Sequence, residues 1–241
     1  NNQWWYNGAD MEEETNQPIS LRATWRMMRP VVAPSQPSSS IEATRPSLVR
    51  VIVVVMPAYN AEPTLRKTYA EIPFEYIDEA ILVDDSSSDR TVEIARELGC
   101  RTLVHLENKG YGGNQKFCYR WAMRHDLDAV VLLHGDGQYA PELLPDMAAP
   151  IISGEADMVS GSRMMNAGAA RDGGMPLYKY VGNRILTTYQ NMMSGLQLSE
   201  WHSGYRAFSI SALARVPFDD NSDNFDFDTE VLVEHLHQGQ R

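Results

Sequence analysis

Three polar side chains at alternate positions could bind a metal ion: His134, Asp136 and Gln138. They follow the apolar run 130–133, whose sequence Val-Val-Leu-Leu is typical of a strand buried on both faces of a parallel sheet. If the backbone stays extended beyond that strand, alternate side chains point the same way and the three converge. Oxygen ligands at such a point suit Mg²⁺ or Mn²⁺ carrying a phosphate. A strand followed by an ordinary Asp-Gly turn would show the same residues, so the motif alone does not decide between the two.

Segments typical of strands and helices alternate along the rest of the chain. Short apolar runs predict strands at 51–56, 80–83, 102–105, 129–133 and 157–160. Helices are predicted at 62–72, 90–98, 115–124, 142–153 and 177–196, with a flexible loop over 108–114. This order predicts an α/β fold with a mainly parallel central sheet flanked by helices. Because polar clusters follow the strands, we expect them to meet at one edge of the sheet, where open α/β sheets bind ligands.

Length and composition indicate the class of protein. A chain of 241 residues with 43% apolar residues can bury one substantial core. The net charge of −11 argues against bulk nucleic-acid binding, which depends on basic patches. Cys100 and Cys118 match no metal-binding spacing and are expected to be reduced thiols. No apolar run is long enough to cross a bilayer and no secretory signal is visible, so we expect a cytoplasmic protein, with at most peripheral association with a membrane.

The chain is expected to divide into two parts. Residues 1–48 are polar and include a stretch rich in Pro and Ser, and such composition buries too little apolar surface to offset its ordering entropy. We therefore expect 1–48 to be a disordered arm or linker and 49–241 to be the folded domain.

Six motifs, in order, cover most of residues 50–235. They are Met56-Pro57-Ala58-Tyr59-Asn60 with Glu62, Asp84-Asp85-Ser86-Ser87-Ser88-Asp89-Arg90-Thr91, Asn108-Lys109-Gly110, Gly135-Asp136-Gly137-Gln138-Tyr139, Gly161-Ser162-Arg163 and Ser203-Gly204-Tyr205-Arg206-Ala207-Phe208. Together they resemble family 2 glycosyltransferases of the GT-A fold, and within them the polyprenyl-phosphate sugar synthases, such as the dolichyl-phosphate mannose synthases. Those enzymes usually continue into another strand, so the comparison leaves three expectations for 49–241: a fragment, a domain truncated at its C-terminal end, or a domain with a divergent end.

The resemblance implies a GDP- or UDP-linked sugar as donor, Mg²⁺ or Mn²⁺ as cofactor, inversion at the anomeric carbon and, as acceptor, a polyprenyl phosphate. Carried over by position, the donor-binding residues on the first two strands are Pro57, Tyr59, Glu62, Asp84 and Asp85. The first three would line the nucleoside pocket, and Asp84 would accept a hydrogen bond from the base or ribose.

The resemblance places the metal on Asp136 and Gln138, but departs at His134. The family usually has Asp there, and an imidazole favours Mn²⁺ over Mg²⁺ or contacts the donor without touching metal. A metal held in place stabilises the charge that grows on the departing nucleoside diphosphate. We therefore expect Asp136 to be catalytic.

Basic residues could hold the acceptor phosphate. Arg163, Arg206 and Lys179 are the candidates, the two arginines being expected among the catalytic residues because guanidinium groups bind phosphate in bidentate fashion. Lys109 could reach the donor. Simpler explanations stay open: Arg163 could pair with an acidic neighbour, and the lysines could face water.

Other functions remain open at this stage. If the acceptor were a hydroxyl of a glycan, His202 or Asp228 could take its proton. A sugar nucleotidyltransferase would share the acidic strand ends, but its glycine- and arginine-rich signature after the first strand is absent. A non-catalytic nucleotide-sugar-binding module would bind the donor without turnover.

Overall fold

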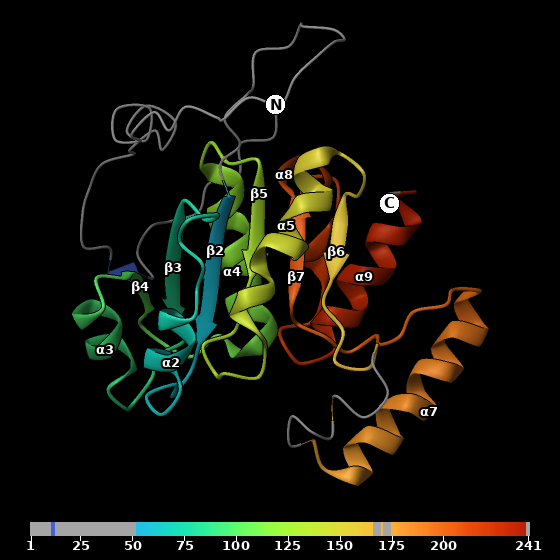
Figure 1. Cartoon of the computed structure of the whole chain (residues 1–241), viewed down its shortest axis with the longest axis horizontal. Helices are drawn as coiled ribbons and strands as arrows, with labels where there is room; N and C mark the ends of the chain where they lie inside the picture. The colour runs from blue at the N-terminus through green and yellow to red at the C-terminus, as the bar shows by residue number, and fades with distance from the viewer. Residues whose placement is uncertain (1–10, 13–51, 166–169, 171–174, 240–241) are drawn as a thin grey trace, which may run out of the picture.

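A central sheet organises the part of the chain that the computed structural model describes, residues 11–12, 52–165, 170 and 175–239. Its strand order is β1-β4-β3-β2-β5-β7-β6 (Figure 1). The strands are β1 (Met11–Glu12), β2 (Ile52–Ala58), β3 (Glu79–Asp84), β4 (Arg101–His105), β5 (Ala129–Leu132), β6 (Met158–Ser160) and β7 (Arg206–Ser209). The longer helices are α2 (Leu65–Ala70), α3 (Thr91–Glu97), α4 (Gly110–Arg124), α5 (Leu144–Ser153), α7 (Leu177–Ser194) and α9 (Phe227–His237). Short helical turns are η2 (Pro141–Leu143), α8 (Ile210–Leu213) and η3 (Phe218–Asp220).

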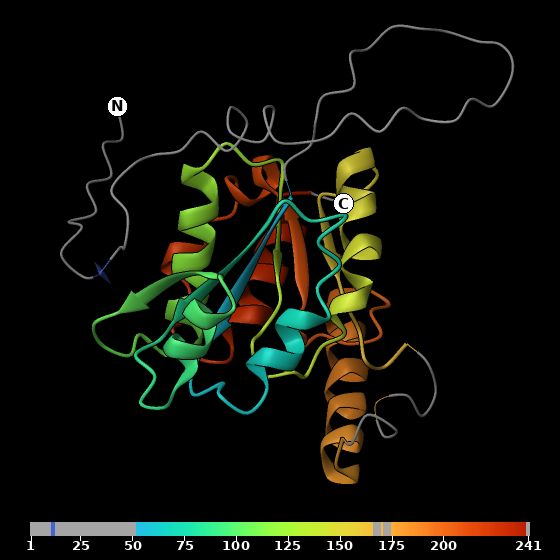
Figure 2. The same cartoon turned by 60° about the vertical axis from the view of Figure 1, so that its left-hand side comes forward.

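Helices cover both faces of the sheet (Figure 2), and a buried apolar cluster lies on each face. In β2, Val53 and Val55 pack against α4 and α9, whereas Val54 and Met56 pack against α2, α3 and α5. Alternate residues of a strand point to opposite faces, so a continuous apolar run supplies both cores. The predicted α/β fold and the strands taken as β2 to β6 are confirmed.

The four strands β4, β3, β2 and β5 are parallel, whereas β7 is antiparallel to both of its neighbours, β5 and β6. The sequence analysis did not predict β7. Because β7 runs in the opposite direction, its first residue, Arg206, lies at the edge where the parallel strands end, opposite Leu132 and Ser160. The segment that precedes β7 therefore enters the site at this edge.

Helix α4 begins at Gly110, so the predicted loop over 108–114 and the helix start at 115 are wrong. Glycine disfavours helix, but close packing requires it here. A Cβ on Gly112 would lie 2.5 Å from the carbonyl oxygen of Ser222 and 2.9 Å from the Cβ of Phe227. The N–H of Gly112 donates to the carbonyl of Asp223 at 2.7 Å. The glycine thus lets the start of α4 approach the segment before α9.

Gly112→Ala is expected to lower the free energy of unfolding by about 3 kcal/mol, because the added methyl group meets backbone atoms that cannot turn aside. Denaturant unfolding measures this change. Gly182→Ala in α7 is the matched control, since nothing lies within 4 Å of its added Cβ, and it is expected to stabilise by about 0.5 kcal/mol. Equal effects at the two positions would contradict the packing argument.

Of residues 1–48, only Met11 and Glu12 belong to the described part, and they pair antiparallel with β4 opposite His105 and Val104. The other residues for which a disordered arm was predicted, 1–10 and 13–48, lie outside the described ranges. Within those ranges, none of the helices has the length and apolar character needed to span a bilayer.

Candidate active site

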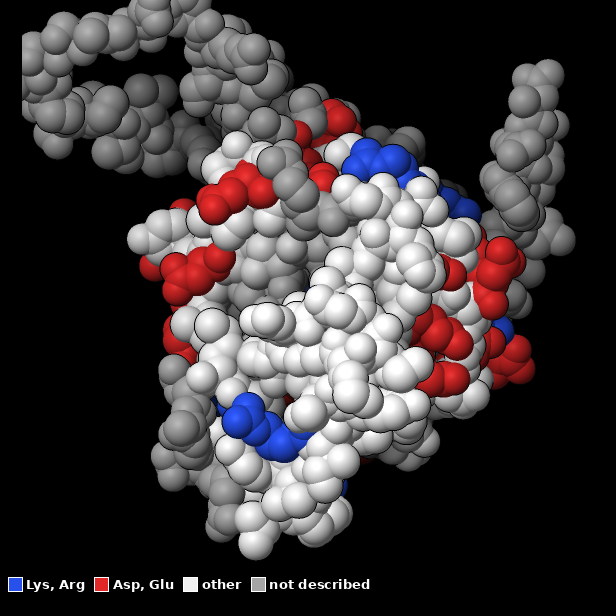
Figure 3. Space-filling view, turned by 90° about the vertical axis from the view of Figure 1, so that its right-hand side faces the viewer, with Lys and Arg blue, Asp and Glu red and all other residues white. Residues whose placement is uncertain are grey.

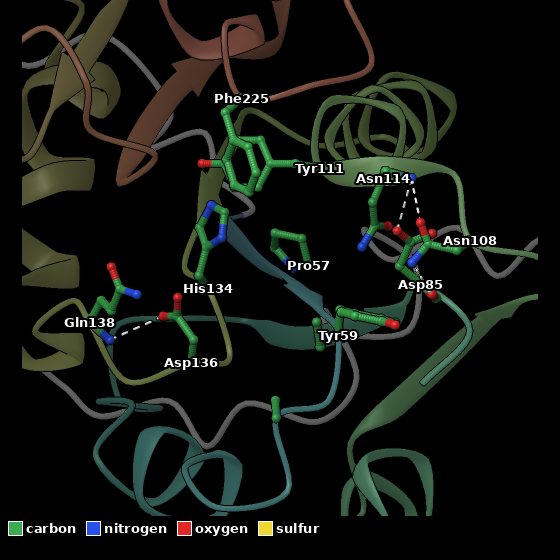
Figure 4. Close-up of a pocket in the computed structure, with 13 residues that line it drawn as sticks. Pro57, Tyr59, Asp85, Asn108, Tyr111, Asn114, His134, Asp136, Gln138 and Phe225 are labelled. Atoms are coloured by element: carbon green, nitrogen blue, oxygen red, sulfur yellow. Dashed lines mark hydrogen bonds between the residues drawn. The ribbon is translucent and has the colours of Figure 1, made fainter. Parts of the chain in front are cut away.

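A cavity of about 430 Å³ opens where the parallel strands end (Figure 4). Its lining residues come from the ends of β2, β3, β4 and β5, from the start of α4 and from the segment before α9: Pro57, Ala58, Tyr59, Ala61, Asp85, Asn108, Gly110, Tyr111, Asn114, His134, Asp136, Gln138 and Phe225. The predicted meeting of polar clusters at one edge of the sheet is therefore found. This first cavity is called the donor cavity below.

Hydrogen bonds between strand ends fix the floor of the donor cavity. The N–H of Asp85 donates to the carbonyl of Ala58 at 2.8 Å, and the N–H of Gly135 donates to that of Pro57 at 3.3 Å. The hydroxyl of Thr64 donates to the carbonyl of Gly135 at 2.7 Å. The residues that follow β2, β3 and β5 are thereby joined into one surface.

Asp85 faces the donor cavity, and its neighbour Asp84 does not line it. The carboxylate of Asp85 accepts from the N–H groups of Lys109 and Gly110, at 2.7 and 3.1 Å, at the start of α4. Burial raises the pKa of Asp85, although these two donors oppose the rise. Asp84 instead accepts from the N–H and hydroxyl of Ser87, at 2.9 and 2.5 Å, so it shapes the loop after β3.

Two more predicted donor residues lie outside this lining. Glu62 accepts from the N–H of Arg90 at 3.2 Å, which ties the start of α2 to the start of α3. The ammonium group of Lys109 pairs with Glu107 at 2.8 Å. Pro57 and Tyr59 do line the cavity, and Tyr59 is 57% exposed.

His134, Asp136 and Gln138 all line the donor cavity. The backbone that carries them is not extended, although the sequence analysis assumed an extended one. Residues 135–137 form a turn, with Gly137 at φ +71°. Asp136 accepts from the N–H of Gln138 at 3.1 Å, and both side chains are exposed. His134 points toward Tyr111 and Phe225, away from the other two (Figure 4).

His134 is buried among aromatic rings. Its ring stacks on Tyr111 with centroids 5.3 Å apart and meets the edge of Tyr139 at 5.7 Å. Burial lowers the pKa of His134, while the carboxylates of Asp228 and Asp136 oppose the change. Its Nε2 atom has no hydrogen-bond partner among the described residues. The neutral imidazole is thus held as a buried ring in the wall of the donor cavity, with Nε2 packed against Gly204.

No group of three or more His, Cys, Asp and Glu side chains suited to a metal occurs within the described ranges. A divalent ion at this site would therefore depend on Asp136, on the amide oxygen of Gln138, and on oxygens of a phosphate ligand and water. Such a ligand set is ordinary for Mg²⁺, which is commonly held by one or two carboxylates and substrate phosphates. The residues present fit the expected ion.

A buried polar group supports the back of the donor cavity. Asp228 accepts from the Tyr111 hydroxyl at 2.7 Å and from the Gln115 amide at 3.2 Å. Gly204 lies against it, since a Cβ there would be 2.6 Å from the Tyr111 hydroxyl and 2.7 Å from Nε2 of His134. The N–H of Gly204 donates to the hydroxyl of Tyr139 at 2.9 Å. The segment before β7 therefore fixes the ring positions around His134.

Arg206 is 1% exposed and lines neither cavity. Its guanidinium donates to the backbone carbonyls of Ser203 at 2.9 Å and Trp201 at 3.4 Å. In this structure it holds the segment that carries Gly204. The prediction that it contacts an acceptor phosphate remains untested.

A second cavity of about 610 Å³ adjoins the first and shares Gln138 with it. It is called the acceptor-side cavity below. Most of its lining is apolar or aromatic, with two cations: Gly137, Gln138, Tyr139, Ala140, Leu143, Met147, Gly161, Ser162, Arg163, Ala170, Met175, Pro176, Lys179 and Tyr205. Two predicted phosphate-binding residues, Arg163 and Lys179, thus meet in one place.

Arg163 pairs with an acidic neighbour, as one of the explanations from sequence allowed. Its guanidinium donates to Glu200 at 2.5 Å, and its N–H donates to the other oxygen of the same carboxylate at 2.8 Å. The guanidinium also lies over the ring of Tyr139, 5.6 Å from the centroid. The Glu200 side chain is fully buried, whereas that of Arg163 is 28% exposed. The pair therefore presents the guanidinium to the acceptor-side cavity.

His105, at the end of β4, gives a pH dependence of stability. Burial lowers the pKa of His105, a change that Asp85 and Asp84 oppose and Lys109 reinforces. Below about pH 6.5 the imidazole of His105 is protonated in the unfolded chain but stays neutral in the folded chain. The stabilisation present above that pH is therefore lost as the pH falls toward the lowered pKa.

We expect the melting temperature to fall between about pH 7.5 and 5.5, and to fall less steeply in His105→Gln. Calorimetry at several pH values measures both slopes. His237→Gln, at the exposed end of α9, is the control and should keep the wild-type slope. A wild-type slope in His105→Gln would contradict the assignment.

The sequence analysis named Tyr111, Asn114 and Tyr139 only as parts of motifs or segments, and it did not single out Phe225 or Glu200. Tyr111, Asn114 and Phe225 line the donor cavity, Tyr139 lines the acceptor-side cavity, and Glu200 anchors Arg163. For Tyr111 and Asn114 the available signal was their position beside the glycines that begin α4. Glu200 carried no signal, because it follows no strand.

The sequence and the fold are each similar to those of known proteins. The family model Glycosyl transferase family 2 matches residues 53–216. The UDP-N-acetylglucosamine–dolichyl-phosphate N-acetylglucosaminyltransferase of Methanococcus voltae is 32% identical over 181 residues, covering 68% of this chain and 71% of that protein. The undecaprenyl-phosphate mannosyltransferase of Micrococcus luteus is 25% identical over 197 residues, covering 79% of each. A glucosyl-3-phosphoglycerate synthase from Mycobacterium tuberculosis, crystallised with Mn²⁺, UDP and glucosyl-3-phosphoglycerate, has a similar fold, with a TM-score of 0.59 at 21% identity over 82% of this chain and 72% of that chain.

Proposed function

Since the chain belongs to glycosyltransferase family 2 and is a glycosyltransferase with the expected GT-A fold, we propose that it transfers a sugar from a UDP- or GDP-linked donor to a polyprenyl phosphate. The observation that carries this proposal is the pair of adjoining cavities that share Gln138. One cavity contains carboxylates at strand ends, and the other combines cations with an apolar lining. A sugar phosphate and a lipid phosphate can thus meet at their junction.

The donor cavity suits a nucleoside diphosphate sugar. Tyr59 offers an exposed ring on which a base could stack, and the Asp85 carboxylate lies beside it as an acceptor for base or ribose. Asp136 and Gln138 would hold Mg²⁺ or Mn²⁺ at the diphosphate, where the cation would stabilise the leaving group's charge. The M. tuberculosis protein, crystallised with Mn²⁺ and UDP, has a similar fold.

The acceptor-side cavity suits an amphiphilic anion. Arg163 and Lys179 provide positive charge, while Leu143, Met147 and Met175 provide apolar surface. Two relatives are named for dolichyl phosphate and undecaprenyl phosphate. Each of these lipids combines a negatively charged phosphate with an apolar chain, which matches the cations and the apolar surface of the cavity. A phosphate acceptor is ionised near neutral pH and requires no general base.

The base candidates for a hydroxyl acceptor are poorly placed. Asp228 lines neither cavity and is engaged by Tyr111 and Gln115. His202 also lines neither, and its Nδ1 lies 3.3 Å from the hydroxyl of Thr229. These contacts favour the phosphate acceptor over a glycan hydroxyl.

Calorimetric titration with UDP and GDP, with and without Mn²⁺, tests the donor half of the proposal. We expect one nucleotide to bind in a Mn²⁺-dependent manner, and a product assay with the matching sugar nucleotide and a short polyprenyl phosphate to show transfer. Binding of neither nucleotide under any condition would overturn the proposal. Binding without transfer to any acceptor would instead indicate a non-catalytic module.

A further inference from the structure

Helix α7 carries apolar side chains on the side that faces away from the rest of the protein. Tyr178, Val181, Ile185, Tyr189 and Met192 recur at intervals of three or four residues and form one stripe along the helix. They are 45 to 73% exposed. These five residues are called the outer face of α7. A contiguous apolar stripe of this kind in contact with water indicates an interaction surface.

The opposite side of α7 is polar and is fixed to the domain. The Asn183 amide donates to Glu200 at 3.0 Å, and Asn191 donates to the carbonyl of Leu198 at 2.8 Å. The indole of Trp201 donates to Asn191 at 2.8 Å. Thr187, between these two asparagines, is the one buried residue of the helix. This is the reverse of an ordinary surface helix, whose apolar stripe faces the core. The polar anchors therefore hold the outer face toward the surroundings.

The charge of α7 differs from that of the whole chain. Its two charged residues are Lys179 and Arg184, and it has no carboxylate, although the chain has a net charge of −11. At about 100° per residue, these two cations lie on either side of the outer face. In Figure 3, which looks from the right of Figure 1, red side chains gather higher up and the lower part is white and blue. Because charges farther away than about 10 Å are largely screened, the carboxylates elsewhere on the chain have little effect at the outer face.

The helix also adjoins the acceptor-side cavity. Pro176, just before α7, and Lys179, in its first turn, both line that cavity. Figure 1 shows α7 at the end of the molecule where the parallel strands terminate. Whatever covers the outer face therefore lies beside the mouth of this cavity.

We propose that the outer face of α7 docks on an anionic lipid surface. An interfacial helix of this type buries its apolar stripe at the headgroup boundary, with tyrosines at that level and cations reaching the phosphates. A second copy of α7 fits less well, because it would bring cations together with no carboxylate on either helix to pair with them. The inference rests on the proposed function in one respect: docking would place the acceptor-side cavity at the membrane that holds a lipid acceptor.

Co-sedimentation of the full chain with vesicles tests the proposal, using phosphatidylcholine alone or mixed with phosphatidylglycerol and no polyprenyl phosphate. We expect binding to the anionic vesicles that weakens at high salt. Ile185→Glu combined with Tyr189→Glu should weaken it by at least about tenfold. Tyr76→Glu is the matched control: Tyr76 is 58% exposed and Tyr189 is 57% exposed, but Tyr76 precedes β3, at the other end of the sheet. It should bind like the wild type.

Several results would overturn the proposal. They are absence of vesicle binding by the wild type, unchanged binding by the double variant, and equal loss in Tyr76→Glu. A dimer that the double variant dissociates, without vesicle binding, would assign the outer face to a second copy. Nucleotide titration of the same variants separates this inference from the proposed function, because the outer face lies outside the donor cavity. Failure of docking alone would leave donor binding intact.

Discussion

Asp136→Asn is expected to lower the transferase rate by about 10³-fold and to abolish the Mn²⁺ dependence of nucleotide binding. Asp136 lines the donor cavity with an exposed carboxylate, which accepts a hydrogen bond from the N–H of Gln138. The other carboxylate of that lining, Asp85, is engaged by two backbone N–H groups. If Asp136 holds the proposed divalent ion, loss of its negative charge would remove the principal anionic ligand of that ion.

Rates with saturating donor and calorimetry with and without Mn²⁺ measure the effect. Asp220→Asn is the control: it removes an exposed carboxylate outside both cavities and should change neither quantity. Because Asp136 is exposed, the melting temperature should stay near that of the wild type. Full activity in Asp136→Asn would show that the metal, if used, is held elsewhere.

Glu200→Ala is expected to lower the free energy of unfolding by about 3 kcal/mol. The buried carboxylate accepts from the N–H and guanidinium of Arg163 and from the amide of Asn183, so its removal leaves several donors unpaired. One oxygen connects the loop after β6 to helix α7. The same substitution should therefore disturb the acceptor-side cavity and raise the KM for a lipid phosphate more than that for the donor.

Denaturant unfolding gives the stability change. Glu97→Ala is the matched control: Glu97 pairs with Arg66 and Arg90, but its side chain is 48% exposed. Exposed ion pairs contribute less than about 1 kcal/mol, so the control should be nearly neutral. A nearly neutral Glu200→Ala would show that water can replace the carboxylate.

The parallel half of the fold was predictable because local pattern and tertiary environment agree there. Val53 to Met56 are apolar at every position, as a doubly covered strand requires. The start of α4 was not predictable, because helix propensity disfavours Gly110, Gly112 and Gly113. Gly110 has a positive φ, and Gly110 and Gly112 pack closely against residues 222–223.

The site was predictable to the level of the motif but not of the individual side chain. Asp84 and Asp85 are neighbours in sequence, yet one shapes a loop and the other faces the cavity. Which of the two carboxylates faces the cavity depends on the residue at which β3 ends. Arg206 shows the same limit, since its burial follows from the antiparallel position of β7, for which the motif gave no signal.

The position of β7 also sets an order of assembly. Strand β6 pairs with β7, and β7 in turn with β5, so the sheet joins 158–160 to 129–132 only through 206–209. Contacts this distant in sequence form late, because the intervening chain must first be brought together. A nascent chain that ends before β7 would expose the edge of β5 to pairing with other chains. The β-α-β units that carry Asp85 and Asp136 can form during synthesis, and the segment that carries Gly204 and Tyr205 then packs behind His134 and completes the wall of the acceptor-side cavity.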